Sequence, residues 1–281
     1  MRRPRTATDG GAGAVATMDE PAPTPEVPPD VTVRLLGPFE LAVAGAPVPR
    51  WTSLKGLTIL KYLLLQGGRA RREELMELLW PGYRPQSARN NLNVAIYGVR
   101  RDFAAAADGA ALLVYAGGCY ILSPELVWRT DLDALTAALA DADRALAAGD
   151  HAPAAEGYRR AIALYRGPLL EDELNGEWHL DERRVVEERY LAAEEALARL
   201  QLDEDEVVAA VALGERVLRT DPCRESAHRL LMRCFARQHQ GHLVARQFRR
   251  CHDALGRELG LRPAGETRRL YQELTGGAGP S

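Results

Sequence analysis

The sequence has no long apolar run, few cysteines and almost no lysine. No apolar stretch approaches the roughly 18 residues that a membrane-spanning helix needs. The first residues lack the apolar core of a secretion signal, despite Arg2 and Arg3. The four cysteines lie far apart without a Cys-x-x-Cys pair, which favours a reduced, cytoplasmic protein. Lysine occurs only at positions 55 and 61, so arginine supplies nearly all of the positive charge.

The common motifs of nucleotide binding and hydrolysis are also missing. The sequence contains no Gly-x-x-x-x-Gly-Lys-Ser/Thr loop, no Gly-x-Ser-x-Gly and no His-Glu-x-x-His. We therefore expect no enzymatic activity and no cofactor. His239 and His242 stand near Cys234 and Cys251, which leaves a zinc site open as an alternative. The two cysteines occupy core-like helical positions, so we predict buried thiols and no metal.

The net charge of −3 hides an uneven distribution. Residues 31–124 hold 11 Lys and Arg against 6 Asp and Glu, whereas residues 125–281 hold 22 against 28. A basic module is thus joined to an acidic one, and a basic module supplies the sequence-independent attraction to phosphate that DNA binding needs. Residues 1–30 are rich in Pro, Ala, Gly and Thr with almost no large apolar side chains, which predicts a disordered tail.

The basic module alternates between strand and helix patterns. Apolar residues alternate along residues 31–43 with a Gly37-Pro38 break, which predicts a small antiparallel sheet. Helical spacing predicts helices over residues 55–65, 71–80 and 87–103, with Ser87 as the N-cap of the third. Strand-forming residues on both sides of Gly117-Gly118 predict a terminal hairpin. This order of elements is typical of a winged helix-turn-helix with an extra N-terminal sheet.

The helix at residues 87–103 has two unlike faces. One carries an apolar stripe, made of Ala88, Leu92, Ile96, Val99 and Phe103. The other carries Asn90, Asn93, Val94, Tyr97 and Arg101. Asn and Arg can hydrogen-bond the edges of adenine and guanine in a major groove, and Val can contact a thymine methyl group. The second face is therefore either a DNA-reading surface or an ordinary solvated helix face.

The basic module resembles the OmpR-type DNA-binding domain of the Streptomyces antibiotic regulatory protein family of transcriptional activators. The resemblance rests on LKGLTILKYLLL, on REELMELLWPGYRPQSARNNLNVAIYGVRRDF and on GGCYIL, and spans most of residues 31–124. It implies that the third helix enters the major groove and that the wing reaches the adjacent minor groove. The residues that it implies as base-facing are Asn90, Asn93, Val94, Tyr97 and Arg101. Those that it implies as phosphate contacts are Lys55, Arg72, Arg84, Arg89 and Arg100. The wing at residues 112–120 contains no Arg or Lys, so Tyr115 or backbone amides would have to serve there.

In the acidic half, the sequence pattern predicts pairs of helices, with residues at spacings that repeat loosely from pair to pair. Small and aromatic residues recur as in a tetratricopeptide repeat, although Gly214 replaces the expected aromatic. A long charged helix is expected over residues 178–200, with Glu194-Glu195 on a solvated face. Residues 131–275 resemble the bacterial transcriptional activation domain of the same family, through YRGPLL, Trp178 and LGRELGLRP. We therefore expect three regions: a tail over residues 1–30, a winged-helix domain over 31–124 and a repeat domain over 131–275.

The resemblance implies a sequence-specific transcriptional regulator. Family members bind double-stranded DNA at direct repeats near promoters, often as dimers, and recruit RNA polymerase to activate transcription. An alternative is a tetratricopeptide-type adaptor whose winged helix is not used for specific DNA recognition, which the uncharged wing favours. A third interpretation, a regulator that responds to a small molecule, requires a ligand pocket in the repeat domain.

Overall fold

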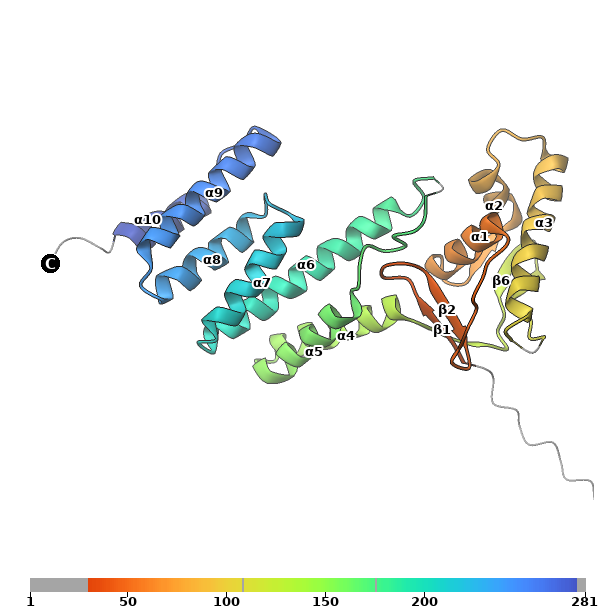
Figure 1. Ribbon diagram of the computed structural model, residues 1–281, viewed down its shortest axis with the longest axis horizontal. Coiled ribbons are helices and arrows are strands. Elements are labelled where there is room, and N and C mark those ends of the chain that lie inside the picture. The colour runs from red at the N-terminus through yellow and green to blue at the C-terminus, as the bar shows by residue number, and fades with distance from the viewer. Residues whose placement is uncertain (1–29, 108, 175, 277–281) are drawn as a thin grey trace, which may run out of the picture.

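The computed structural model describes residues 30–107, 109–174 and 176–276, so the predicted tail lies outside it except for Asp30, which begins the first strand. Figure 1 shows an elongated molecule, with a small α/β module at one end and stacked helices extending to the other. The strands are β1 (Asp30–Arg34), β2 (Glu40–Val43), β3 (Ala46–Pro47), β4 (Arg69–Arg71), β5 (Leu113–Ala116), β6 (Cys119–Leu122) and β7 (Val127–Thr130). The helices are α1 (Leu54–Leu65), α2 (Arg72–Leu79), α3 (Pro85–Ala104), α4 (Asp131–Ala147), α5 (His151–Leu164), α6 (Leu180–Asp203), α7 (Val207–Thr220), α8 (Glu225–Arg237), α9 (Gly241–Leu259) and α10 (Gly265–Gly276). The predicted fold class, a winged helix followed by an all-α repeat domain, is confirmed.

A four-stranded sheet opens the described chain, in the order β3-β2-β1-β7. Val31 and Val33 are fully buried and alternate with more exposed residues along β1, as expected for a strand with one face on the core. β1 pairs antiparallel with β2, as the small antiparallel sheet predicted over residues 31–43 requires. The sequence pattern does not reveal β7, which runs parallel to β1 and sets Trp128 opposite Val31. The segment that leads into the helical half is therefore part of the first sheet.

Helices α1 to α3 follow this sheet, and a second sheet in the order β4-β6-β5 closes the winged helix. The predicted helices are found within three residues of their expected ends. The prediction for Ser87 is wrong, because Arg84 precedes the first turn of α3 and Pro85 occupies its first position. The β5–β6 hairpin turns at Gly117 and Gly118, whose φ angles of 57° and 79° are those that a tight two-residue turn requires.

The helical half consists of successive helix pairs, α4 with α5, α6 with α7 and α8 with α9, as the repeat spacing predicts. The unexpected Gly214 has a packing reason: a Cβ at this position would lie 2.9 Å from Leu231 on α8. α10 caps the last pair, and its Tyr271 ring stacks on Phe248 of α9 with centroids 4.3 Å apart. Within the described residues, no helix is long and apolar enough to span a bilayer.

The expectation that Glu194 and Glu195 lie on a solvated face is wrong. Both side chains are buried on α6, at 0% and 3% exposure. Glu194 forms an ion pair with Arg216 and accepts a hydrogen bond from the Tyr190 hydroxyl at 2.7 Å. Glu195 forms an ion pair with Arg224, which directly precedes α8, and accepts a hydrogen bond from Ser226. The acidic pair therefore joins α6 to its neighbours, because a buried carboxylate needs charged or hydrogen-bonding partners.

The two halves share one apolar core. The loop between α5 and α6 returns to the first sheet, and we call its residues 166–173 the clamp loop. Leu169 forms a bridge with Leu36, and the Leu170 N–H donates to the Leu35 carbonyl at 2.7 Å. All four leucines are fully buried in the core that also contains the winged helix. The apolar core is therefore continuous across the domain boundary that the sequence predicts between residues 124 and 131.

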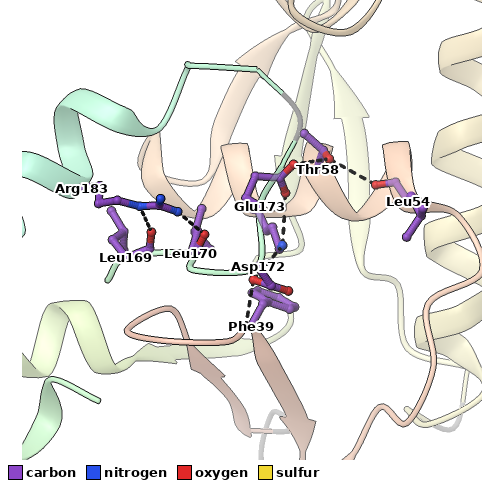
Figure 2. A network of polar contacts seen from close by, with 9 residues as sticks. Phe39, Leu54, Thr58, Leu169, Leu170, Asp172, Glu173 and Arg183 are labelled. Atoms are coloured by element: carbon purple, nitrogen blue, oxygen red, sulfur yellow. Dashed lines mark hydrogen bonds and ion pairs between the residues drawn. The ribbon is translucent and has the colours of Figure 1, made fainter. Parts of the chain in front are cut away.

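The clamp loop also supplies two carboxylates to the winged helix. Figure 2 shows Glu173 directed toward Thr58 on α1, and Asp172 close to Phe39. Lys61 Nζ lies 3.1 Å from Glu173 Oε2 and 3.3 Å from Asp172 Oδ1. Since the Lys61 and Glu173 side chains are only 2% and 3% exposed, this ion pair lies inside the contact between the halves. One of the two lysines therefore contributes nothing to the basic surface.

Candidate nucleic-acid interface

Helix α3 lies at the end of the molecule farthest from α9 and α10 (Figure 1). Its apolar stripe is buried as predicted, and consists of Ala88, Leu92, Ile96, Val99 and Phe103. The predicted base-facing residues are all exposed, namely Asn90, Asn93, Val94, Tyr97 and Arg101. Val94 and Tyr97 are 71% and 68% exposed, so most of each side chain is not covered by other described residues. The face therefore combines amide groups with large exposed side chains. Such a surface is typical of an interaction site, and not of a face adapted only to water.

Close backbone contact with α1 fixes the position of α3. Ser53 caps α1 by accepting a hydrogen bond from the Gly56 N–H, and its hydroxyl donates to the Ala95 carbonyl of α3 at 3.3 Å. Gly56 and Gly98 stand at the crossing of the two helices. A Cβ at Gly98 would lie 2.5 Å from Ser53 Cβ, and one at Gly56 would overlap the Ala95 carbonyl oxygen. These glycines allow the N-terminus of α1 to lie directly against α3.

Arg101 differs from the other base-facing candidates because it already has partners. Its guanidinium group lies 3.1 Å from the Asp102 carboxylate and donates to the Thr52 hydroxyl. Asp102 also accepts a hydrogen bond from the Thr52 N–H at 2.6 Å. Burial opposes ionisation of Asp102, but the hydrogen bonds from Thr52 and Arg101 outweigh it and lower the Asp102 pKa. Arg101 would therefore have to leave part of this network to contact a base.

The predicted phosphate contacts fall into two groups. Arg84 and Arg89 are exposed and form no ion pair within the described residues, so their charge is available to a ligand. Lys55 donates to the Leu79 carbonyl at the end of α2 at 2.8 Å. Arg100 donates to the Leu113 carbonyl of β5 at 2.9 Å, and the Arg72 guanidinium lies 4.3 Å from the Tyr115 ring centroid. This second group holds α2 and the wing in place.

The wing carries basic side chains that the local sequence does not indicate. β4 pairs with β6 and sets Arg71 opposite Cys119, next to the Gly117-Gly118 turn. Arg69 and Arg71 are both exposed, and the Arg72 N–H donates to the Gly118 carbonyl at 3.1 Å. Sequence analysis misses these arginines because they lie about 45 residues before the hairpin. The three-stranded wing therefore has positive charge beside its tip.

The thiol and imidazole side chains that the sequence brings close together lie apart in the structure. Cys234 and Cys251 are fully buried, and burial raises their thiol pKa values to about 11 and about 12. His239 and His242 are exposed and do not join them. Across the part of the chain that the structure describes, no three His, Cys, Asp or Glu side chains gather as a metal site would require. The exposed face of α3 and the wing together form a surface whose chemistry suggests a ligand.

Comparison with known proteins agrees with this architecture. Residues 130–275 match the family model for the bacterial transcriptional activator domain. The transcriptional regulatory protein MoaR1 of Mycobacterium tuberculosis is 28% identical over 256 residues, covering 87% of this chain and 79% of MoaR1. EmbR, a transcriptional regulatory protein of the same organism, is 25% identical over 243 residues, which make up 85% of this chain and 62% of EmbR. A solved structure of M. tuberculosis EmbR in complex with a low affinity phosphopeptide has the same fold, with a TM-score of 0.76 at 23% identity over 90% of this chain and 67% of that one.

These relatives and the two-part fold define a bacterial transcriptional regulator. Because the family model covers more than half of the sequence, the chain belongs to the bacterial transcriptional activator domain family. Its winged helix and repeat domain are those of a Streptomyces antibiotic regulatory protein.

Proposed function

We propose that the protein binds double-stranded DNA through α3 and the wing, at direct repeats near promoters, and activates transcription by recruiting RNA polymerase. In this proposal residues 31–124 recognise DNA and residues 131–275 contact the polymerase. The mechanism is binding alone, without a cofactor or covalent chemistry. Two copies bound to adjacent repeats would form the functional dimer.

The observation that carries the proposal is the exposed face of α3. Asn90 and Asn93 lie on it with Val94 and Tyr97, and Arg89 stands on its flank with an available charge. Asn can make paired hydrogen bonds to adenine, Val can contact a thymine methyl group, and Arg can hold a phosphate. Arg69 and Arg71 add positive charge beside the wing, which supports a second contact with the DNA backbone.

The test is binding of the full chain to random-sequence and promoter DNA across a salt series. We expect affinity to fall steeply with salt while a subset that contains direct repeats stays well above non-specific binding, with two proteins bound per pair of repeats. Transcription from such a promoter should rise when polymerase is added with the protein. Weak binding without a preferred sequence would contradict the proposal and support the protein-interaction adaptor.

A further inference from the structure

Helix α9 carries a row of arginines on its outer side. Together with one aspartate they line a shallow groove of about 460 Å³, which we call the arginine groove; it consists of Arg246, Arg249, Arg250, Asp253 and Arg257. All five residues are exposed. From Arg246 to Arg257 the row extends about 16 Å, at a rise of about 1.5 Å per residue.

The fold does not need these arginines for its own packing. α9 packs through its opposite side, where Val244, Cys251 and Leu255 are buried. Arg250 forms an ion pair with Glu215 at 2.7 Å. Arg246 and Arg249 have no ion pair or hydrogen bond from their side chains within the described residues. At least two guanidinium groups are thus held in place by the helix and available to a ligand.

The arginine groove is positively charged, whereas the half of the chain that contains it is acidic. Residues 125–281 carry an excess of six acidic residues, yet the groove holds four arginines against Asp253 alone. Exposed basic residues spread singly over an acidic domain would serve solubility. Four on one side of one helix instead create a local positive potential that favours carboxylates or phosphates. The planar guanidinium group binds either anion through two parallel hydrogen bonds.

Two observations favour protein carboxylates over the phosphates of the operator. Figure 1 places α9 at the opposite end of the molecule from α3, so DNA lying on the exposed face of α3 does not run along α9. Asp253 lies between Arg250 and Arg257 and would repel a continuous row of phosphates. A protein surface can place carboxylates opposite the arginines and a basic or neutral residue opposite Asp253.

We propose that the arginine groove of α9 binds an acidic segment of RNA polymerase holoenzyme, and is the contact through which the protein recruits the enzyme. This inference rests on the proposed function. It assigns recruitment to α9, at the end of the repeat domain that faces away from the DNA-binding helix. Arg246 and Arg249 contribute most of the binding, because they give up no internal partner when they pair with carboxylates.

The experiment compares two charge-reversed variants of the full chain. The test variant is Arg246→Glu with Arg249→Glu. The matched control is Arg219→Glu with Arg268→Glu, two exposed residues outside the groove whose side chains have no ion pair or hydrogen bond within the described residues. Both variants change the net charge equally. Circular dichroism and thermal unfolding verify that each variant folds, and binding to labelled operator DNA is measured beside binding of host RNA polymerase holoenzyme to the operator complex.

The test variant should bind polymerase at least about tenfold more weakly than the wild type, as expected for loss of a central arginine contact, and bind operator DNA within about twofold. The control should match the wild type in both assays. Equal polymerase binding by the test variant and wild type would overturn the inference. So would an equal loss in the control, which would indicate a general charge effect, or a loss of operator affinity, which would place DNA in the groove. If the wild type binds operator without retaining polymerase, the proposed recruitment itself fails, and that outcome differs from failure of the groove alone.

Discussion

The Lys61 ammonium group lies 3.1 Å from Glu173 Oε2, and more than 100 residues of sequence separate the two. Lys61 belongs to α1 of the winged helix, whereas Glu173 belongs to the clamp loop of the helical half (Figure 2). Thr58 donates a second hydrogen bond to Glu173, and the Lys61 ammonium also lies 5.3 Å from the Phe39 ring centroid. The relative orientation of α3 and the repeat domain therefore depends on a buried ion pair as well as on apolar packing.

Breaking this pair on one side should cost more than replacing both partners. Glu173→Leu leaves a nearly buried ammonium group with Asp172 as its one remaining carboxylate partner among the described residues, so we expect a loss of about 3 kcal/mol in the free energy of unfolding. Lys61→Met combined with Glu173→Leu should lie within about 1 kcal/mol of the wild type, since an apolar pair fills the space without desolvated charge. Urea denaturation of the wild type, the two single variants and the double variant measures the coupling free energy between the two side chains. Additive losses would show that the two residues do not act as a pair.

A fragment that ends at Pro124 should not fold as a stable winged helix. It lacks β7, which pairs with β1, and the clamp loop, which covers the fully buried Leu35 and Leu36. Exposing this apolar surface removes roughly 25 cal/mol of stabilisation per Å². We expect the fragment of residues 30–124 to unfold without a cooperative transition and to bind operator DNA poorly, by calorimetry and gel shift. A cooperative transition with wild-type operator affinity would show that the contact between the halves is dispensable.

Gly98→Ala should displace α3 from α1. The added Cβ would meet Ser53, and overpacking of this kind costs about 1 to 3 kcal/mol. Because Ser53 also bonds to the Ala95 carbonyl of α3, we expect weaker operator binding together with a lower Tm. Gly256→Ala is the control, since its Cβ meets nothing within 4 Å on the exposed side of α9 and should raise stability by up to about 1 kcal/mol. A tolerated Gly98→Ala would mean that the helix crossing adapts to the extra methyl group.

Substitutions on α3 should distinguish residues that contact bases from residues that contact phosphates. Asn93→Ala should reduce preference at one position of the operator and cost about 1 to 3 kcal/mol there. Arg89→Ala should weaken all sequences alike and reduce the slope of log K against log salt by about 1. Arg89 is the better test of a phosphate contact than Lys55, whose ammonium group already binds the Leu79 carbonyl. An equal loss on every sequence from Asn93→Ala would rule out base reading by this residue.

Stability should fall in mildly acidic solution through His179. The side chain is 1% exposed, and neither ring nitrogen has a hydrogen-bond partner within the described residues. Burial lowers its pKa below 6.5, and the positive charges of Arg183 and Lys61 act in the same direction. The unfolded chain therefore binds the proton first, so the contribution of the neutral imidazole is complete above about pH 6.5 and is lost as the pH falls below it.

The measurement is the free energy of unfolding of wild type and His179→Leu at pH 7.5 and pH 5.5. The wild type should lose up to about 1.4 kcal/mol per pH unit more than the variant in this interval. His228 is also buried with a lowered pKa and remains in both proteins, so it cancels in the comparison. Equal losses in the two proteins would show that His179 does not titrate in this range.

The elements with local sequence signals could be predicted without the structure. The helical period of α3 placed Asn90, Asn93, Val94 and Tyr97 on one exposed face, because side chains three and four residues apart share a helix face. The Gly117-Gly118 pair located the wing turn, since few other residues accept its positive φ angles. The repeat spacing of small and aromatic residues predicted the helix pairs for the same reason, because each of these signals lies within one or two helical turns.

Which charged side chains are available to a ligand depends on tertiary packing and could not be predicted from the sequence. Lys61 forms an ion pair with Glu173. Arg101 pairs with Asp102 and donates a hydrogen bond to Thr52. Arg69 and Arg71 lie beside the wing because β4 pairs with β6. These contacts join residues that are adjacent in one case and about 50 to 110 positions apart in the others. Burial and partner choice depend on how distant segments pack, and a linear pattern of charges does not contain that information. The sequence therefore predicted the exposed face of α3, and the fold determined which cations near it remain without a partner among the described residues.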